Sequence, residues 1–137
     1  MLDRPTDSIR RARLRKHADY QRVYRESRKH SSASMTYFFA ERRSLPEHGP
    51  RVGLTAGRVL GKAVERNRIK RRMREAVRLN LQTLTRDVDV VLHPRRAVLT
   101  VDISHLMREV GKIFAAIEKT AGAAGEGRPA AAQGAAS

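Results

Sequence analysis

The basic residues between positions 58 and 78 have types and a density that suit the binding of phosphate groups. Nine of the 21 residues in this run are lysine or arginine, and only two are glutamate. A guanidinium group is planar and donates two parallel hydrogen bonds to a phosphate, and arginine outnumbers lysine here. A purely solvated surface with this much like charge would repel itself without any compensating contact. The run therefore predicts a surface that binds a polyanion.

The sequence has no arrangement of residues that is typical of a protein catalyst. Its five histidines lack the spacing of metal ligands, it contains no cysteine, and its 14 acidic residues are scattered. A protein nuclease needs a general acid and base, or a cluster of carboxylates that holds metal ions. We therefore expect neither a catalytic residue nor a metal site in the protein itself.

A helix must position the basic residues, because the apolar residues of the same run keep a helical spacing. Ile69, Met73 and Val77 recur every four residues and share one face of a helix over residues 64–84. The same spacing places polar residues on the other face: Asn67, Arg71, Arg74 and Arg78. We expect the apolar face to pack against the protein and the arginine row to remain in solvent.

The composition favours nucleic acid over a membrane as the polyanion. The net charge is +15, and each phosphate that a cation neutralises releases counterions. No apolar run approaches the roughly 18 residues that span a bilayer, and the arginine-rich N-terminus lacks the apolar segment of a signal peptide. We expect a cytoplasmic protein with no membrane contact and no protein partner.

The remaining segments predict a small α+β protein with a single domain. Residues 1–12 are polar and expected to be flexible, residues 13–120 form the domain, and the Ala/Gly-rich residues 121–137 are expected to be a disordered tail. The expected order is helix, strand, strand, helix, strand, helix, which gives an α/β sandwich. The elements around the basic helix are a helix at 17–27, an antiparallel hairpin of strands 35–41 and 51–55, a strand at 87–93, and a final helix capped by Asp102 or Ser104.

The few aromatic residues are candidates either for the core or for contact with unpaired bases. Tyr20 and Tyr24 lie on the apolar face of the first predicted helix, where a core position is the more common interpretation. Because strand neighbours point to opposite faces, either Phe38 or the pair Tyr37 and Phe39 faces that helix. The offset from Tyr24 favours Phe38.

Two segments resemble the signature of the bacterial ribonuclease P protein subunit. They are residues 51–55 (RVGLT) and residues 61–75 (GKAVERNRIKRRMRE), and the resemblance covers roughly residues 10–118. It implies a protein that binds a large catalytic RNA and assists that RNA in removing the 5′ leader from precursor tRNA. The chemistry then belongs to the RNA, with Mg²⁺ held mainly by the RNA subunit and the substrate. The resemblance also implies a left-handed strand–helix–strand crossover, which base rates would not predict.

The resemblance assigns roles to particular residues. It implies an RNA-binding surface in which three residues match the family's Arg-Asn-Arg motif and three more continue it: Arg66, Asn67, Arg68, Lys70, Arg71 and Arg74. It implies a cleft for the unpaired leader, where stacking on aromatic rings tolerates any sequence. The cleft residues are Tyr20, Tyr24, Phe38, Arg58 and Lys62. Val59 stands where the family usually has a second basic residue, so one charge is missing beside Arg58.

Two other classes of protein share the charge but lack part of the pattern. A basic ribosomal or ribosome-assembly protein would not carry the Gly-x-Ala-Val-x-Arg-Asn-Arg motif of residues 61–68. A transcription factor that inserts a basic helix into DNA would need base-reading residues and usually a dimer interface, and no heptad repeat is present. The ribonuclease P protein is therefore the favoured interpretation, and the ribosomal class is the alternative.

Overall fold

The chain alternates helices and strands in the predicted order, with one additional short strand. The computed structural model describes residues 12–42 and 48–126, with side chains up to residue 120. Its regular elements are α2 (His17–Glu26), β1 (His30–Ser31), β2 (Met35–Glu41), β3 (Arg51–Leu54), α3 (Ala63–Asn80), β4 (Val88–Pro94) and α4 (Ile103–Glu126). Three short 3₁₀ helices lie between them: η1 (Arg58–Leu60), η2 (Leu81–Thr83) and η3 (Arg96–Leu99).

The four strands form one mixed sheet in the order β1-β2-β4-β3. β4 runs antiparallel to β2 and parallel to β3, so Val91 pairs with Phe38 on one side and with Gly53 on the other. The expected hairpin between residues 35–41 and 51–55 is therefore wrong, because β4 lies between those two strands. The physical reason is the run from Val88 to Leu92, which is buried on both faces of the sheet and so takes a central position.

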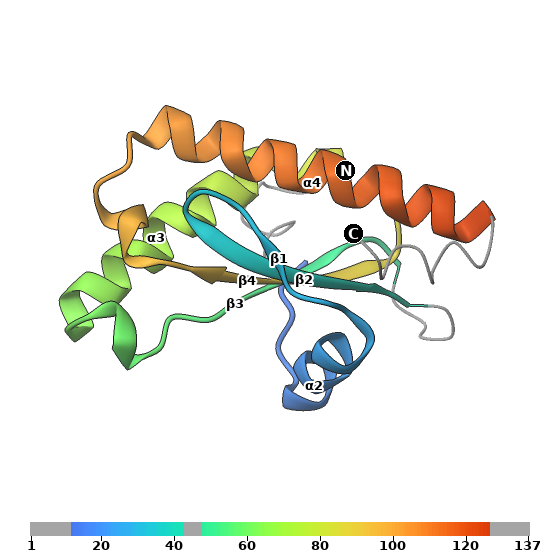
Figure 1. Cartoon of the computed structure of the whole chain (residues 1–137), viewed down its shortest axis with the longest axis horizontal. Coiled ribbons are helices and arrows are strands. Elements are labelled where there is room, and N and C mark those ends of the chain that lie inside the picture. The colour runs from blue at the N-terminus through green and yellow to red at the C-terminus, as the bar shows by residue number, and fades with distance from the viewer. Residues whose placement is uncertain (1–11, 43–47, 127–137) are drawn as a thin grey trace, which may run out of the picture.

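The helices form two layers around the sheet, as Figure 1 shows. α3 and α4 cover one face, and α2 lies alone on the other. The larger apolar core lies between the sheet and α3 with α4, and the smaller core lies under α2 around Val23 and Val91. The α+β class is confirmed by this arrangement. α3 connects the parallel neighbours β3 and β4, and the left hand of this crossover stays a prediction.

α3 and α4 pack through the residues that the helical spacing selects. Ile69, Met73 and Val77 are buried on α3, and the matching stripe of α4 includes Val110 and Phe114. Asp102 caps α4, since its carboxylate accepts the backbone N–H of Ser104 at 3.2 Å. Both helices therefore present their opposite, charged faces to solvent.

The chain ends differ in part from the expectation. The sequence predicts a disordered tail over residues 121–137, but α4 continues into this segment as far as Glu126. The alanines there are good helix formers, and they extend a helix that is already packed on the sheet. Residues 127–137, like residues 1–11 of the expected flexible N-terminus, lie outside the described part of the chain. Ala12 and Leu14 already belong to the fold, because they exchange backbone hydrogen bonds with Val52 of β3.

Candidate nucleic-acid interface

Four of the six residues expected to bind RNA form an exposed row on α3. Asn67, Arg68, Arg71 and Arg74 are exposed, whereas Arg66 and Lys70 are partly buried along one flank of the row. Among the described residues, no carboxylate forms an ion pair with any of these five cations. Their charge is therefore available to an external anion.

The remaining basic residues of α3 are engaged within the protein. Arg72 donates hydrogen bonds to the carbonyl oxygens of Val98, at 2.8 Å, and Val101. Arg78 pairs with Glu75 at 2.6 Å. Arg78, which the helical spacing placed in the binding row, is therefore partly neutralised. The spacing of charges alone does not separate such residues from those that are free to bind.

The start of α3 is fixed by an ion pair that reaches the segment after β4. Glu65 accepts the backbone N–H of Lys62 at 3.0 Å and pairs with Arg96 at 2.7 Å. The hydrogen bond from Arg96, followed by that from Lys62, lowers the pKa of Glu65 to about 2. Gly61 has a φ of 122°, and a Cβ at this position would meet both Glu65 and Arg96. The first turn of the basic helix is therefore held in one orientation.

On the opposite face of the sheet, Tyr24, Phe38 and His93 form a cluster of rings beside α2. The Tyr24 and Phe38 rings meet edge to face with centroids 5.1 Å apart, and the His93 ring lies 5.6 Å from Tyr24 and 5.2 Å from Phe38. The Tyr24 hydroxyl and His93 Nε2 are 2.9 Å apart. All three side chains are partly exposed, so the cluster offers ring edges and a polar group to a ligand.

His93 is a member of this cluster that the sequence did not single out. Its spacing matches no metal-binding motif, and the sequence contains no other local motif that marks it. Strand alternation gives the only signal: His93 lies two residues from Val91, which faces α2. Burial, with the charge of nearby Lys29, lowers the pKa of His93, so its imidazole is neutral near pH 7.

The strand β2 divides its aromatic residues between the two faces of the sheet. Phe38 packs with Tyr24 in the small core under α2, whereas Tyr37 and Phe39 pack against the large core. His30 of β1 stacks on Tyr37 and Phe39, with centroids 5.0 and 5.1 Å away. Of the alternatives that the sequence left open, Phe38 is thus the residue that shares a face with Tyr24.

Tyr20 is set apart from the ring cluster. Its ring lies over the backbone of β3, where a Cβ on Gly53 would come within 2.5 Å of the hydroxyl, and that hydroxyl donates to the Leu14 carbonyl at 3.3 Å. It also borders a pocket of about 90 Å³ that reaches Arg13 and Arg74. Tyr20 therefore has a clear structural role and lies between the α2 face and the basic row.

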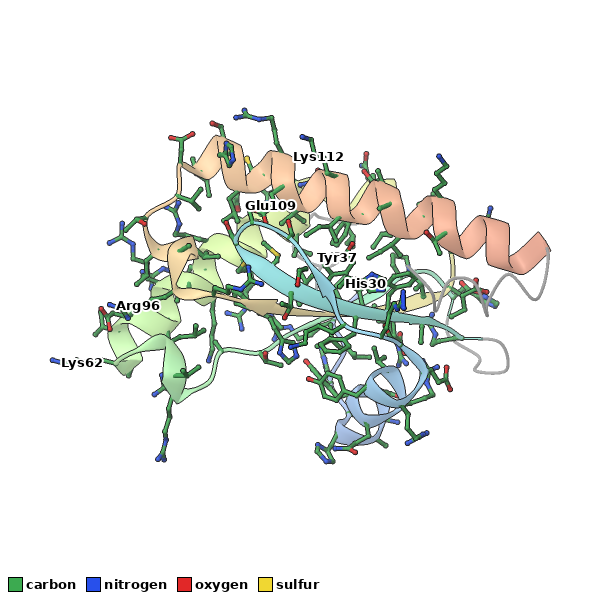
Figure 2. The ribbon with its side chains drawn as sticks, in the orientation of Figure 1. His30, Tyr37, Lys62, Arg96, Glu109 and Lys112 are labelled. Atoms are coloured by element: carbon green, nitrogen blue, oxygen red, sulfur yellow. The ribbon has the colours of Figure 1, made fainter. Side chains whose placement is uncertain are left out.

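The two cations expected in the leader cleft do not touch the ring cluster. Arg58 and Lys62 are exposed in and just after η1, and Figure 2 shows Lys62 extending into solvent at the end of the molecule beside Arg96. Val59 is 91% exposed between them. The structure thus groups Tyr24 and Phe38 but leaves Arg58 and Lys62 on a separate loop.

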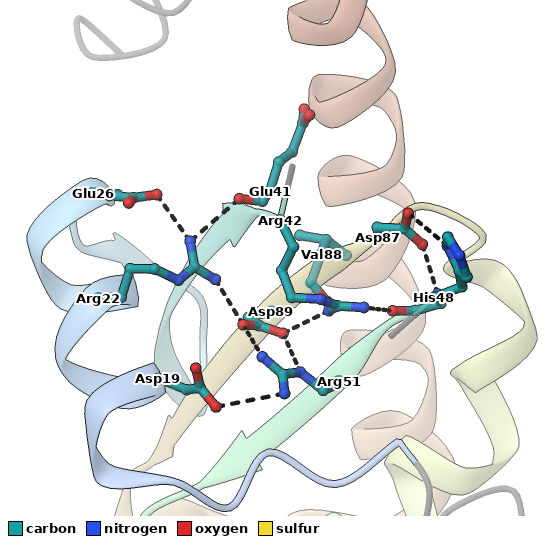
Figure 3. Close-up of polar contacts among 11 residues, drawn as sticks. Asp19, Arg22, Glu26, Glu41, Arg42, His48, Arg51, Asp87, Val88 and Asp89 are labelled. Carbon is teal, nitrogen blue, oxygen red and sulfur yellow. Dashed lines mark hydrogen bonds and ion pairs between the residues drawn. The ribbon is translucent and has the colours of Figure 1, made fainter. Parts of the chain in front are cut away.

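A buried carboxylate organises a second set of arginines that the sequence analysis missed. Asp89 of β4 is fully buried and accepts hydrogen bonds from three arginines, each from a different segment (Figure 3). The donors are Arg22 of α2 at 2.7 Å, Arg42 after β2 at 2.7 Å, and Arg51 of β3 at 2.8 Å. Burial alone would raise the pKa of Asp89, but the arginines outweigh it and hold the pKa below its usual value. This cluster ties α2 to the sheet.

The described residues show neither a metal-binding cluster nor a membrane-spanning helix. They contain no group of three or more histidine, aspartate or glutamate side chains that could hold a metal ion. In the same part of the chain, every helix is too short or too polar to cross a bilayer.

Comparisons with known proteins place the same segments in one family. Residues 9–118 match the family model described as Ribonuclease P. The chain is 43% identical over 108 residues to the ribonuclease P protein component of Chloroflexus aggregans, covering 77% of this chain and 78% of that protein. It is 34% identical over 110 residues to the component from Desulforapulum autotrophicum, covering 80% and 92%. The solved RNase P protein of Staphylococcus aureus has the same fold, with a TM-score of 0.66 at 20% identity over 78% of this chain and 95% of that one.

Proposed function

The chain belongs to the bacterial ribonuclease P protein family, and from this premise we propose which of its surfaces bind which RNA. It is the accessory protein subunit of an endoribonuclease that processes the 5′ end of tRNA, and its partner is ribonuclease P RNA. Membership of this family removes the ribosomal alternative. We assign the exposed row of α3 to the catalytic RNA and the ring cluster beside α2 to the 5′ leader of precursor tRNA.

The assignment of α3 to the catalytic RNA rests on the unpaired cations of this helix. Arg68, Arg71 and Arg74 are exposed and have no carboxylate partner among the described residues. The two glutamates of the same helix, Glu65 and Glu75, each pair with a different arginine. A rigid helix holds these guanidinium groups at fixed spacing, which favours simultaneous contact with several phosphates. Asn67 contributes an amide within the same row.

The ring cluster supports the assignment of the leader. A leader is single-stranded, and unpaired bases stack on aromatic side chains with a gain of about 1–3 kcal/mol per base. Phe38 and Tyr24 are partly exposed, and the adjacent His93 adds a neutral hydrogen-bonding edge. Arg58 and Lys62 are exposed on the loop before α3 and are assigned to the phosphates of the leader further along its path.

The magnesium ions that the family implies are assigned to the RNA and the substrate. The described side chains do not fit a magnesium site, since they include no group of three or more carboxylate or histidine side chains that could hold a metal ion. Mg²⁺ supplies charge stabilisation to phosphodiester cleavage, and the protein contributes affinity and position for the strand being cut. We place this reaction in the bacterial cytoplasm, which is consistent with the absence of a spanning helix from the described residues.

Reconstitution tests whether the RNA subunit performs the cleavage and the protein contributes affinity for the substrate. The purified protein is mixed with Mg²⁺ and a precursor tRNA that carries a leader of several nucleotides, with and without the catalytic RNA. We expect cleavage only when the RNA is present, and we expect the protein to tighten binding of precursor tRNA far more than binding of mature tRNA. Cleavage by the protein alone that survives nuclease treatment, or an equal gain for both substrates, would contradict the proposal.

A further inference from the structure

The outer face of α4 carries a second row of basic residues that the assigned interfaces leave unused. His105, Arg108, Lys112 and Lys119 fall within about 60° of one another at 3.6 residues per turn, and all four are exposed. Arg108 and Lys119 are separated by about 16 Å along the helix at 1.5 Å per residue. Figure 2 shows Lys112 pointing away from the sheet.

The two carboxylates of α4 whose side chains the structure describes, Glu109 and Glu118, are engaged with other segments of the protein. Glu109 is buried and accepts hydrogen bonds from the Ser32 hydroxyl at 2.5 Å and the Ser34 backbone N–H at 2.7 Å. Glu118 accepts the backbone N–H of Thr85 at 2.9 Å. Within the described residues, none of Arg108, Lys112 and Lys119 has a carboxylate partner at ion-pair distance. The row is therefore not neutralised from within the helix.

The basic row of α4 contains two cations that repel each other. Arg108 and Lys112 are four residues apart, so two like charges face each other on adjacent turns, which destabilises a helix. A face that is merely solvated usually interleaves acidic residues three or four positions from its cations, as Glu75 does three positions before Arg78 on α3. An external anion would relieve the repulsion.

We propose that the outer row of α4, formed by Arg108, Lys112 and Lys119, is a second contact surface for the phosphate backbone of ribonuclease P RNA. α3 and α4 pack side by side on the same face of the sheet, and Asn80 of α3 donates to the Met107 carbonyl of α4 at 2.9 Å. Both basic rows thus belong to one rigid layer, so one large RNA can contact both. The proposal rests on the family's RNA partner and is independent of the assignments made to α3 and to the leader cleft.

Salt dependence of binding distinguishes a phosphate contact from a solvated face. The variant Lys112→Gln/Lys119→Gln removes two charges from α4, and Lys16→Gln/Arg25→Gln removes two exposed charges from the other side of the sheet. At about 0.7–0.9 per phosphate contact, we expect the slope of log K against log salt for the catalytic RNA to fall by about 1.4–1.8 in the α4 variant. The control variant should keep the wild-type slope. Circular dichroism and thermal melting should be unchanged in both, because the sites are exposed.

Each other outcome decides against the proposal. An unchanged slope in the α4 variant shows a solvated face, and equal losses in both variants show a general effect of net charge. A loss seen only for precursor tRNA, with binding to the catalytic RNA intact, shows that α4 faces the substrate instead.

Hydroxyl-radical footprinting of the catalytic RNA provides a second measurement. We expect a segment of the RNA backbone that the wild type protects from cleavage and that the α4 variant leaves exposed. Variants of Arg68 and Arg71 test the α3 assignment separately, so failure of one proposal leaves the other standing.

Discussion

Two groups of arginines in this protein have the same chemistry and opposite roles. Arg22, Arg42 and Arg51 converge on one buried carboxylate, whereas Arg68 and Arg71 project from α3 without a carboxylate partner among the described residues. The first group joins α2, β2 and β3 through Asp89, and the second is free to join the protein to RNA. The two groups differ because only the first surrounds a buried acid. This acid is Asp89, and the alternation of side chains along β4 directs it into the protein.

The buried group also determines where the ring cluster can form. Asp89, Val91 and His93 alternate along β4 on the face that α2 covers, so the anchoring carboxylate and the imidazole belong to one row of side chains. Arg22, which α2 contributes to Asp89, lies two residues before Tyr24. The arginines that hold the fold therefore position the rings that we assign to the leader.

The largest expected effect comes from removing the shared carboxylate. Asp89→Asn leaves three guanidinium groups at a buried site without their counter-charge, and breaking such a cluster costs about 3–5 kcal/mol. Arg71→Ala, at an exposed site, should change the free energy of unfolding by no more than about 0.5 kcal/mol. Urea unfolding followed by circular dichroism measures both. If the two variants are equally stable, the two groups of arginines do not differ as described.

Acid should weaken the buried group in a way that depends on its arginines. The pKa of Asp89 is lower in the folded chain than in the unfolded chain, where aspartate titrates near about 3.9. Its contribution to stability is therefore complete above that pH and is lost as the pH falls through the folded value. Arg22→Ala removes one donor and should raise the folded pKa of Asp89 toward the unfolded value, so the loss of stability in acid should be smaller and should end at a higher pH.

The measurement is urea unfolding between pH 3 and 7 for wild type and Arg22→Ala. Asp87 also has a lowered pKa, but it is common to both proteins, so its contribution cancels in the difference between the two profiles. Two profiles that differ only by a constant offset would show that Arg22 does not affect the titration of Asp89.

A smaller effect, on substrate binding, separates the two faces of the sheet. Phe38→Ala should weaken holoenzyme binding to precursor tRNA by about 1–3 kcal/mol if a leader base stacks there, and should leave mature tRNA unaffected. Phe39→Ala is the matched control, because it removes the same ring from the neighbouring position on the opposite face. Tyr24→Phe keeps the ring and removes only the contact with His93, so its effect should be smaller. Equal weakening of both substrates by Phe38→Ala would make Phe38 a structural residue.

The sequence predicted the helices, because they follow from local periodicity, and the same periodicity predicted which face of α3 is exposed. The spacing of Ile69, Met73 and Val77 fixes which face of α3 is buried, and the exposure of Arg71 follows from it. The family resemblance added the function, which composition alone left open between several RNA-binding classes. Comparison with known proteins then confirmed the family.

The features that the sequence did not predict depend on contacts between distant segments. Strand order is one, since only the burial of β4 on both faces places it between β2 and β3. The partners of Asp89 are another, because they lie 38 to 67 residues away in sequence. Helical spacing leaves Arg72 out of the row that contains Arg71, but only the folded chain shows that Arg72 donates to carbonyl groups.

The adjacent residues Arg71 and Arg72 show whether the unpaired cations of α3 bind the catalytic RNA, because only Arg72 is engaged within the protein. Binding of the catalytic RNA is measured over a range of salt concentrations for wild type, Arg71→Ala and Arg72→Ala, with folding verified for each. We expect Arg71→Ala to lower the slope of log K against log salt by about 0.7–0.9 and Arg72→Ala to leave it unchanged. A wild-type slope for Arg71→Ala, or an equal decrease for both variants, would contradict the assignment of α3 to the catalytic RNA.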